Sequence, residues 1–236
     1  MSMEMDDLRK IMCSRIARRI HPLRAILGQH ANMHFWVAGG ALIRDGNDVD
    51  LFCPTEWPKI DWSTVEVVSE SKNARTVVVG DAVFQFCNYR KPTLDELLKS
   101  FDFAHCQVGC DVKVTGSGNF VVDGVRGTDA YINSRWANTS WFTGSEYPLS
   151  SLIRIHKYYA NGILTKGAAI RSTIDALEAV VRRGFNGYDD FKDQLDALDY
   201  LGLLPDDMEN VEKSSLTNLF TLLNKVTVKQ HDGSGQ

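Results

Sequence analysis

Two aspartates, Asp48 and Asp50, open the apolar segment Asp48–Cys53 and are the residues best suited to chemistry. Side chains alternate across a β-strand, so both carboxylates should share one face, about 6.6 Å apart along the backbone. Two carboxylates that close repel each other unless a cation lies between them. A hard divalent ion that takes oxygen ligands, Mg²⁺ or Mn²⁺, is the natural occupant. The alternative is a surface strand that follows a turn and binds no metal.

A glycine pair, Gly39-Gly40, follows the apolar run Met33–Ala38 and precedes the two aspartates. Backbone without Cβ atoms can approach a ligand closely, and a helical turn after it offers free N–H groups to phosphate. An anion cradle beside a metal site fits a nucleoside triphosphate with its magnesium; ATP is the first candidate, and the base preference stays open. Arg44 is a further nucleotide-binding candidate, and an ion pair with Asp45 is its alternative role.

A third carboxylate is expected from Asp102, in a strand predicted over Phe101–Val108. An aspartate in an apolar strand is costly to bury unless it is paired, hydrogen-bonded or bound to metal. The flanking phenylalanines should therefore face the core while Asp102 faces the metal. Other acids could take this role; they are Asp111, Asp123 and Glu66.

Basic residues of the C-terminal half provide candidates for binding the triphosphate. Arg154 and Lys157 lie about one turn apart on a predicted helix, and Lys166 precedes the next one. The alternative for all three is a solvated helix surface.

The order of these motifs resembles the polymerase-β-like nucleotidyltransferase superfamily, to which poly(A) polymerases and CCA-adding enzymes belong. Gly39-Gly40, Asp48-Val49-Asp50 and Phe101-Asp102-Phe103 carry the resemblance. Weaker similarity to uncharacterised viral and phage members lies in Phe84-Gln85-Phe86 and Tyr147–Tyr159. The second glycine, Gly40, replaces the commoner serine, so one hydroxyl contact to phosphate would be missing.

The resemblance implies two-metal phosphoryl chemistry. Asp48 and Asp50 would hold both ions, and Asp102 would complete the second site and help to activate an acceptor hydroxyl. Gly39 and Gly40 would bind the β- and γ-phosphates, and pyrophosphate would leave. The acceptor stays open between an RNA 3′ end, a protein and a small molecule. The alternatives are a catalytically inactive module that binds a nucleotide or a partner, and a structural protein with these motifs by chance.

The elements that position these residues predict an α+β fold, with a mixed sheet followed by helices. A helix is expected over residues 5–28, ended or kinked at Pro22, with a basic surface that is either solvated or follows phosphates. Four regions are predicted: a basic amphipathic helix (1–30), a catalytic sheet domain (31–125), a helical region (126–228) and a disordered tail (229–236).

The composition is that of a soluble globular protein. The chain has 236 residues, 44% of them hydrophobic, and a net charge of −4. These values argue against a disordered chain or a fibre, and no overall basic field indicates nucleic acid. No apolar run long enough for a membrane span, no signal peptide and no disulfide spacing are visible, which favours a cytoplasmic location without a membrane partner. The oligomeric state stays open.

Overall fold

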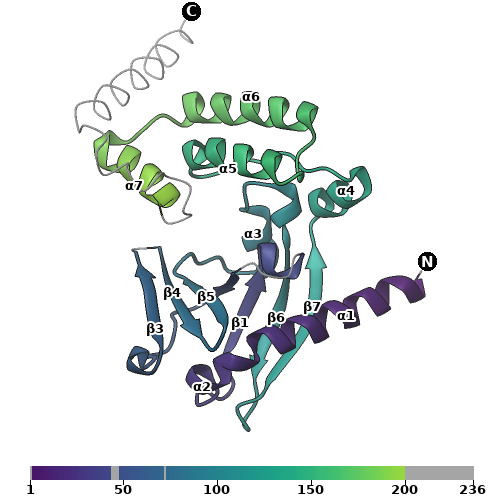
Figure 1. The fold of residues 1–236 in the computed structure, drawn as a ribbon, viewed down its shortest axis with the longest axis vertical. Coiled ribbons are helices and arrows are strands. Elements are labelled where there is room, and N and C mark those ends of the chain that lie inside the picture. Colours follow the sequence, from purple (N-terminus) through teal and green to yellow (C-terminus); the bar gives the residue numbers. More distant parts are fainter. Residues whose placement is uncertain (1, 44–47, 72, 200–236) are drawn as a thin grey trace, which may run out of the picture. The chain divides into compact units, whose positions relative to one another are not determined.

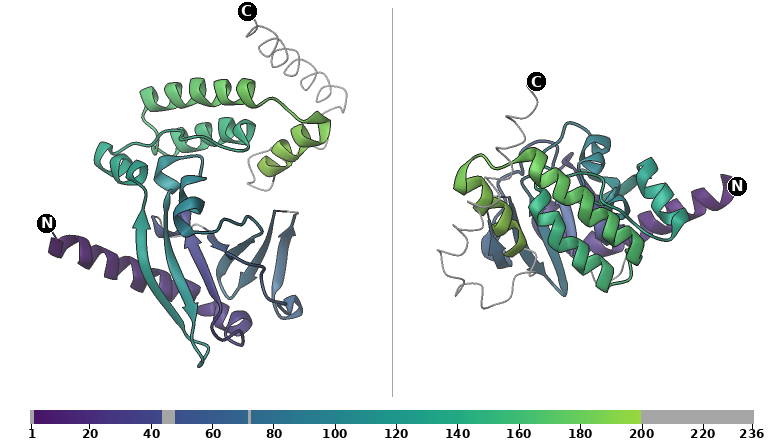
Figure 2. Two further views of the ribbon diagram at one scale, coloured as in Figure 1. Left: turned by 180° about the vertical axis from the view of Figure 1, so that it is seen from behind. Right: turned by 90° about the horizontal axis from the view of Figure 1, so that it is seen from above.

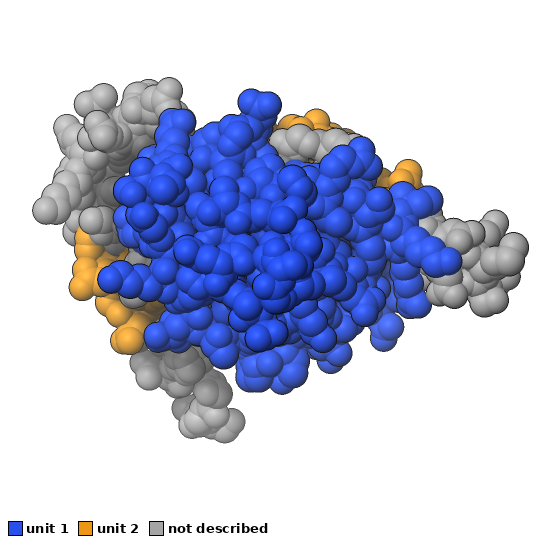
Figure 3. Space-filling model, turned by 90° about the horizontal axis from the view of Figure 1, so that it is seen from below, with its two compact units in different colours: residues 1–101, 105–133 blue, residues 102–104, 134–236 orange. Residues whose placement is uncertain are grey.

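The computed structural model describes residues 2–43, 48–71 and 73–199. Contacts divide the chain into two compact units, coloured separately in Figure 3. Unit 1 holds residues 1–101 and 105–133, and unit 2 holds residues 102–104 and 134–236. Residues 102–104 thus belong to the unit formed by a later part of the chain.

Unit 1 is built on a seven-stranded mixed sheet with the order β3-β4-β5-β2-β1-β6-β7 (Figure 1). β2 and β5 are parallel, and the other neighbouring pairs are antiparallel. The strands are β1 (His34–Ala38), β2 (Val49–Phe52), β3 (Glu66–Glu70), β4 (Ala74–Val79), β5 (Ala82–Cys87), β6 (Val108–Val114) and β7 (Phe120–Gly127).

One face of this sheet is covered by the N-terminal helices. α1 (Ser2–Ile20) crosses the strands and buries Ile16 and Ile20 against alternate residues such as Phe35 and Val37. Pro22 lies in a 3₁₀ turn, η1 (His21–Leu23), that separates α1 from α2 (Arg24–Leu27). The predicted interruption at Pro22 is confirmed, because proline has no N–H to continue the helix.

The opposite face is partly covered by α3 (Leu94–Lys99). Thr93 caps this helix by accepting a hydrogen bond from the backbone N–H of Glu96. A Cβ on Gly109 of β6 would lie 3.0 Å from Leu94 and 3.1 Å from Leu98. The absence of a side chain at Gly109 therefore lets α3 pack closely on the sheet.

Unit 2 is helical. α4 (Asp129–Ala137) spans the boundary between the units, and unit 2 continues with α5 (Pro148–Ala160), α6 (Lys166–Arg183) and α7 (Gly187–Asp199). α5 and α6 run side by side in both views of Figure 2, and α7 also contacts α5. A buried hydroxyl, Ser172 on α6, accepts a hydrogen bond from the backbone N–H of Phe142.

The predicted strand over Phe101–Val108 is wrong. Residue 103 makes only an isolated bridge to Phe142, Ala104–Cys106 form a 3₁₀ turn, and β6 begins at Val108. The Phe-Asp-Phe alternation is strand-like, but the backbone of this segment hydrogen-bonds to a loop. The N–H of Thr143 donates to the carbonyl of Asp102, and the N–H of Ala104 donates to the carbonyl of Trp141. Strand alternation therefore does not set the direction of the Asp102 side chain.

The mixed sheet with helices confirms the α+β prediction. In the described part of the chain no helix is both long and apolar enough to cross a membrane. The last part of the predicted helical region (200–228) and the predicted tail (229–236) lie outside the described residues. The four predicted regions stay predictions.

Candidate functional site

A row of small and polar residues crosses the centre of the sheet on the face opposite α1. Five Cα partners in register form it: Thr76, Gln85, Asp50, Ala38 and Gly109. Directly opposed residues direct their side chains to the same face of a sheet. Asp50 thus lies between the amide side chain of Gln85 and the methyl group of Ala38.

The glycine pair lies directly beside Asp50. β1 ends at Ala38 and continues into a 3₁₀ turn, η2 (Gly39–Leu42). Gly39 has φ +80°, a backbone conformation that other residues rarely adopt, and a Cβ there would lie 3.5 Å from Asp50 Oδ2. Arg19 of α1 supports the turn by donating a 2.7 Å hydrogen bond from Nη1 to the carbonyl of Ala41. Gly39 and Asp50, eleven residues apart in the sequence, therefore meet at the Asp50 carboxylate.

Asp48 and Asp50 lie in different local environments. β2 begins at Val49, so Asp48 precedes the strand and is exposed, whereas Asp50 is half-buried within it. Strand alternation consequently does not fix the direction of Asp48, and the shared face stays a prediction. Arg44 lies outside the described residues.

Gln85 was not singled out as a site residue by the sequence analysis, yet it is the register partner of Asp50. Cys87, two residues further along β5, has its pKa raised well above the ordinary value, mainly by burial and then by the Asp50 charge. The signal in the sequence was a polar residue between Phe84 and Phe86, both of which are buried on the other face. Only the parallel pairing of β2 with β5 shows that this position adjoins Asp50.

Asp102 is buried in unit 2, with 6% of its surface exposed. Its Oδ2 accepts hydrogen bonds from Ser151 Oγ at 2.8 Å and from Arg154 Nη1 at 2.9 Å. The neighbouring Phe103 ring packs against Phe142 and Tyr158, with centroids 6.0 and 4.8 Å away. Asp102 therefore connects its short segment to α5 through a charge-assisted pair, and its role as a third metal ligand stays a prediction.

The three predicted triphosphate-binding residues differ in surroundings. Arg154 is paired with Asp102 and is half-buried, while Lys157 on α5 and Lys166 at the start of α6 are exposed. Their contact with a nucleotide stays a prediction for all three.

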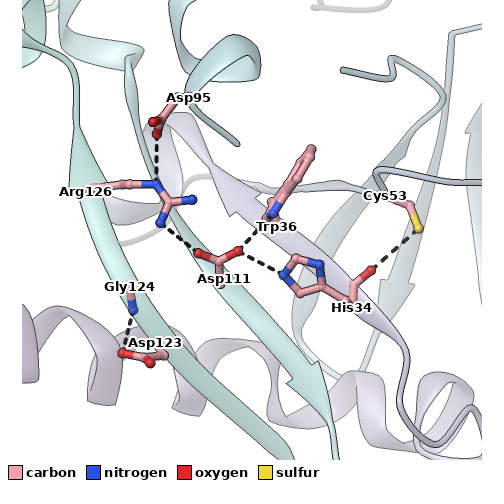
Figure 4. A network of polar contacts seen from close by, with 8 residues as sticks. All are labelled: His34, Trp36, Cys53, Asp95, Asp111, Asp123, Gly124 and Arg126. Atoms are coloured by element: carbon pink, nitrogen blue, oxygen red, sulfur yellow. Dashed lines mark hydrogen bonds and ion pairs between the residues drawn. The ribbon is translucent and has the colours of Figure 1, made fainter. Parts of the chain in front are cut away.

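Asp111, the main alternative third acid, lies at the centre of a polar network on β1, β6 and β7 (Figure 4). Its Oδ1 lies 2.9 Å from His34 Nε2 and accepts a 3.0 Å hydrogen bond from Trp36 Nε1. Its Oδ2 lies 3.1 Å from Arg126 Nη1, and Arg126 Nε in turn lies 2.9 Å from an oxygen of Asp95. These partners neutralise Asp111 and tie three strands to α3.

The remaining alternatives differ in their relation to this network: Asp123 on β7 is the Cα register partner of Asp111 (Figure 4), whereas Glu66 lies on β3. Asp123 accepts a hydrogen bond from the next backbone N–H, at Gly124, and Glu66 is exposed on the edge strand β3. Neither position adjoins Asp50 in the sheet register.

The oxygen groups of unit 1 fit a magnesium ion bound together with a substrate. Among the described residues, no three His, Cys, Asp or Glu side chains form a metal-binding group. Mg²⁺ is usually held by one or two carboxylates together with waters and substrate phosphates rather than by an all-protein cage. Asp50 and the amide oxygen of Gln85, together with Asp48 if it shares their face as predicted, would be the hard oxygen ligands for this mode.

Comparisons with known proteins identify a distant structural neighbour. No family model matches the chain, and no curated protein matches it. A solved structure described as "tRNA-processing enzyme (apo form I)" aligns with a TM-score of 0.39 and 15% sequence identity. The alignment covers 89% of this chain and 62% of that one, so this chain spans less than two thirds of the enzyme's length. A likeness at this level assigns neither an activity nor a substrate to this chain.

Proposed function

We propose that this protein is a Mg²⁺-dependent nucleotidyltransferase. It transfers a nucleoside monophosphate from a nucleoside triphosphate, with ATP as the first candidate, to an acceptor hydroxyl and releases pyrophosphate. The observation that carries the proposal is the Gly39 turn, whose backbone lies against the Asp50 carboxylate. An anion cradle and a cation ligand at one point suit a metal-bound triphosphate.

The residues of this site would bind the phosphates, hold the metal ion or position the turn. The backbone of Gly39 and Gly40 would accommodate the β- and γ-phosphates, because a glycine backbone has no Cβ and can approach a ligand closely. Arg19 is a positioning residue, since its hydrogen bond to Ala41 holds the turn in place. Asp50 and Asp48 would hold the metal ion, and Gln85 would add a neutral ligand or orient Asp50.

Bound Mg²⁺ would neutralise the charge that develops on the phosphates during transfer. Asp102 is the sequence-predicted third ligand, and the proposal does not depend on it. Arg154, Lys157 and Lys166 are proposed to contact the triphosphate, and a separate substitution of each residue would test its contact.

A specific observation favours the alternative of a nucleotide-binding module without turnover. The register partner of Asp50 is the neutral Gln85, and no three-acid group is present among the described residues. Such a site would bind a metal-nucleotide complex but would lack charge for a second ion. Binding and pyrophosphate release must therefore be measured separately.

The experiment uses the full chain with each nucleoside triphosphate, Mg²⁺ or Mn²⁺, and pooled RNA, protein and small-molecule acceptors. Pyrophosphate release and equilibrium nucleotide binding are both recorded. Asp50→Asn should abolish both signals, whereas Asp81→Asn, at an exposed turn of the same unit, should change neither. Binding without release would establish the module, and absence of both in the unsubstituted protein would refute the proposed site.

The glycine turn provides an independent test. Gly39→Ala places a Cβ near Asp50 Oδ2 at φ +80°, whereas Gly80→Ala introduces similar backbone strain at φ +61° with no atom within 4 Å. Both variants should lose about 1–2 kcal/mol of stability. Only Gly39→Ala should also weaken MgATP binding, measured by calorimetry. Equal affinities in the two variants would contradict a phosphate-binding role for the turn.

A further inference from the structure

Residues 8–43 have a charge distribution unlike the rest of the protein, and they follow the acidic start of α1 at Glu4, Asp6 and Asp7. Residues 8–43 contain six Lys and Arg residues and no Asp or Glu, while the whole chain has a net charge of −4. These basic residues lie on or just after α1 in unit 1. They are Arg9, Lys10, Arg15, Arg18, Arg19 and Arg24.

The packing of α1 presents part of this charge to solvent. Ile16 and Ile20 are fully buried against the sheet. Arg18 is two residues from each, about 200° around the helix, and is exposed on the side away from the sheet. Arg9 is also exposed, so exposed basic residues extend over about 14 Å of helix.

A surface hollow continues this basic surface beyond the end of α1. It has a volume of about 440 Å³, and Arg24, His21 and Ser117 contribute to its lining. None of the described residues that line it is acidic. A hollow of this size is in the range that accommodates a nucleotide-sized group.

The basic surface is linked to the proposed nucleotide site by a direct contact. Arg19, next to Arg18 on α1, holds the carbonyl of Ala41 in the turn that contains Gly39 and Gly40. A polyanion bound along α1 would therefore be held by the helix that also positions the phosphate-binding turn.

We infer that the exposed basic surface from Arg9 to Arg24, with the adjoining hollow, is a docking site for the sugar-phosphate backbone of RNA. A regularly charged polyanion matches a row of basic side chains, and its backbone is bound without sequence preference. A membrane fits less well, because the apolar side of α1 is buried in unit 1. The further statement that this RNA is the acceptor rests on the proposed nucleotidyl transfer.

The test measures binding of a fluorescein-labelled single-stranded 20-nucleotide RNA to the full chain between 50 and 200 mM KCl. Arg18→Gln/Arg24→Gln is compared with Arg135→Gln/Arg182→Gln, a control with the same charge change at exposed positions in unit 2. The first variant should weaken binding about tenfold and make the dependence of log K on log salt shallower by about 1.4, because two phosphate contacts are lost. The control should differ little from the unsubstituted protein.

Several results would overturn this inference. They are absence of RNA binding, equal weakening in both variants, and tighter binding to phosphatidylserine vesicles or a polyglutamate peptide than to RNA. Circular dichroism checks that the variants are folded, and their MgATP affinity should stay unchanged. RNA binding that depends on Arg18 and Arg24 without pyrophosphate release would support the docking site while refuting nucleotidyl transfer, so the two failures are distinguishable.

Discussion

Replacing Arg154 with methionine should destabilise unit 2 by leaving the buried Asp102 carboxylate without its cation. Methionine retains an unbranched apolar side chain but removes the guanidinium that lies 2.9 Å from Asp102 Oδ2. Asp102 is 6% exposed, and its other bonded donor is the Ser151 hydroxyl. The variant therefore isolates the charge-assisted contact between the segment at Asp102 and α5.

The expected magnitude follows from the burial of the two partners. Breaking a fully buried ion pair by removing one side costs about 3–5 kcal/mol. The Arg154 side chain is 30% exposed and the Ser151 bond remains, so we expect about 2–3 kcal/mol. In a chain of this size that corresponds to a fall in Tm of roughly 4–12 °C. Urea unfolding followed by circular dichroism measures the free-energy change directly.

Lys157→Met is the matched control, since Lys157 is exposed one turn further along the same helix. It should change the free energy of unfolding by less than about 0.5 kcal/mol. Asp102→Asn/Arg154→Met should cost less than the sum of its single variants, because the two residues are in contact. Equal costs for Arg154→Met and Lys157→Met would refute the reasoning. Loss of pyrophosphate release in Asp102→Asn with unchanged stability would instead indicate that Asp102 is a metal ligand.

Two further outcomes concern pH and cysteine chemistry. Asp190 accepts two hydrogen bonds from Arg183, and these bonds are the main reason why its pKa is lowered, so the stabilisation is present above pH 4 and is lost as the pH falls through the lowered value. The difference in unfolding free energy between the unsubstituted protein and Asp190→Asn should be largest at pH 5–7 and should shrink below pH 4. A difference that does not change with pH would contradict this account. Burial raises the pKa of the Cys110 thiol, so iodoacetamide at pH 8 should label Cys110 only after unfolding, whereas it should label the half-buried Cys106 in the native protein. Mass spectrometry measures both, and rapid labelling of Cys110 in the native protein would be inconsistent with its packing.

Local signals were sufficient for much of unit 1 because they act between residues close in sequence. The strand Ala82–Cys87 agrees with the β-branched and aromatic pattern between turn residues. The Thr93 cap is equally local, since its side chain needs only the N–H of Glu96, three residues later. The strand proposed over Phe101–Val108 failed because Asp102 is bonded to residues 49 and 52 positions later, beyond the range of any local pattern.

The α+β class can be predicted from the sequence alone, and so can the glycine and aspartate segments proposed to meet a phosphate and a cation. These predictions are possible because residue type, alternation and backbone permissiveness are local properties. Three contacts become visible only in the folded chain: Gly39 adjoins Asp50, Gln85 is the register neighbour of Asp50, and Asp102 is paired with Arg154. Strand partners and buried charge pairs form between segments distant in sequence, and burial of the whole core selects their register.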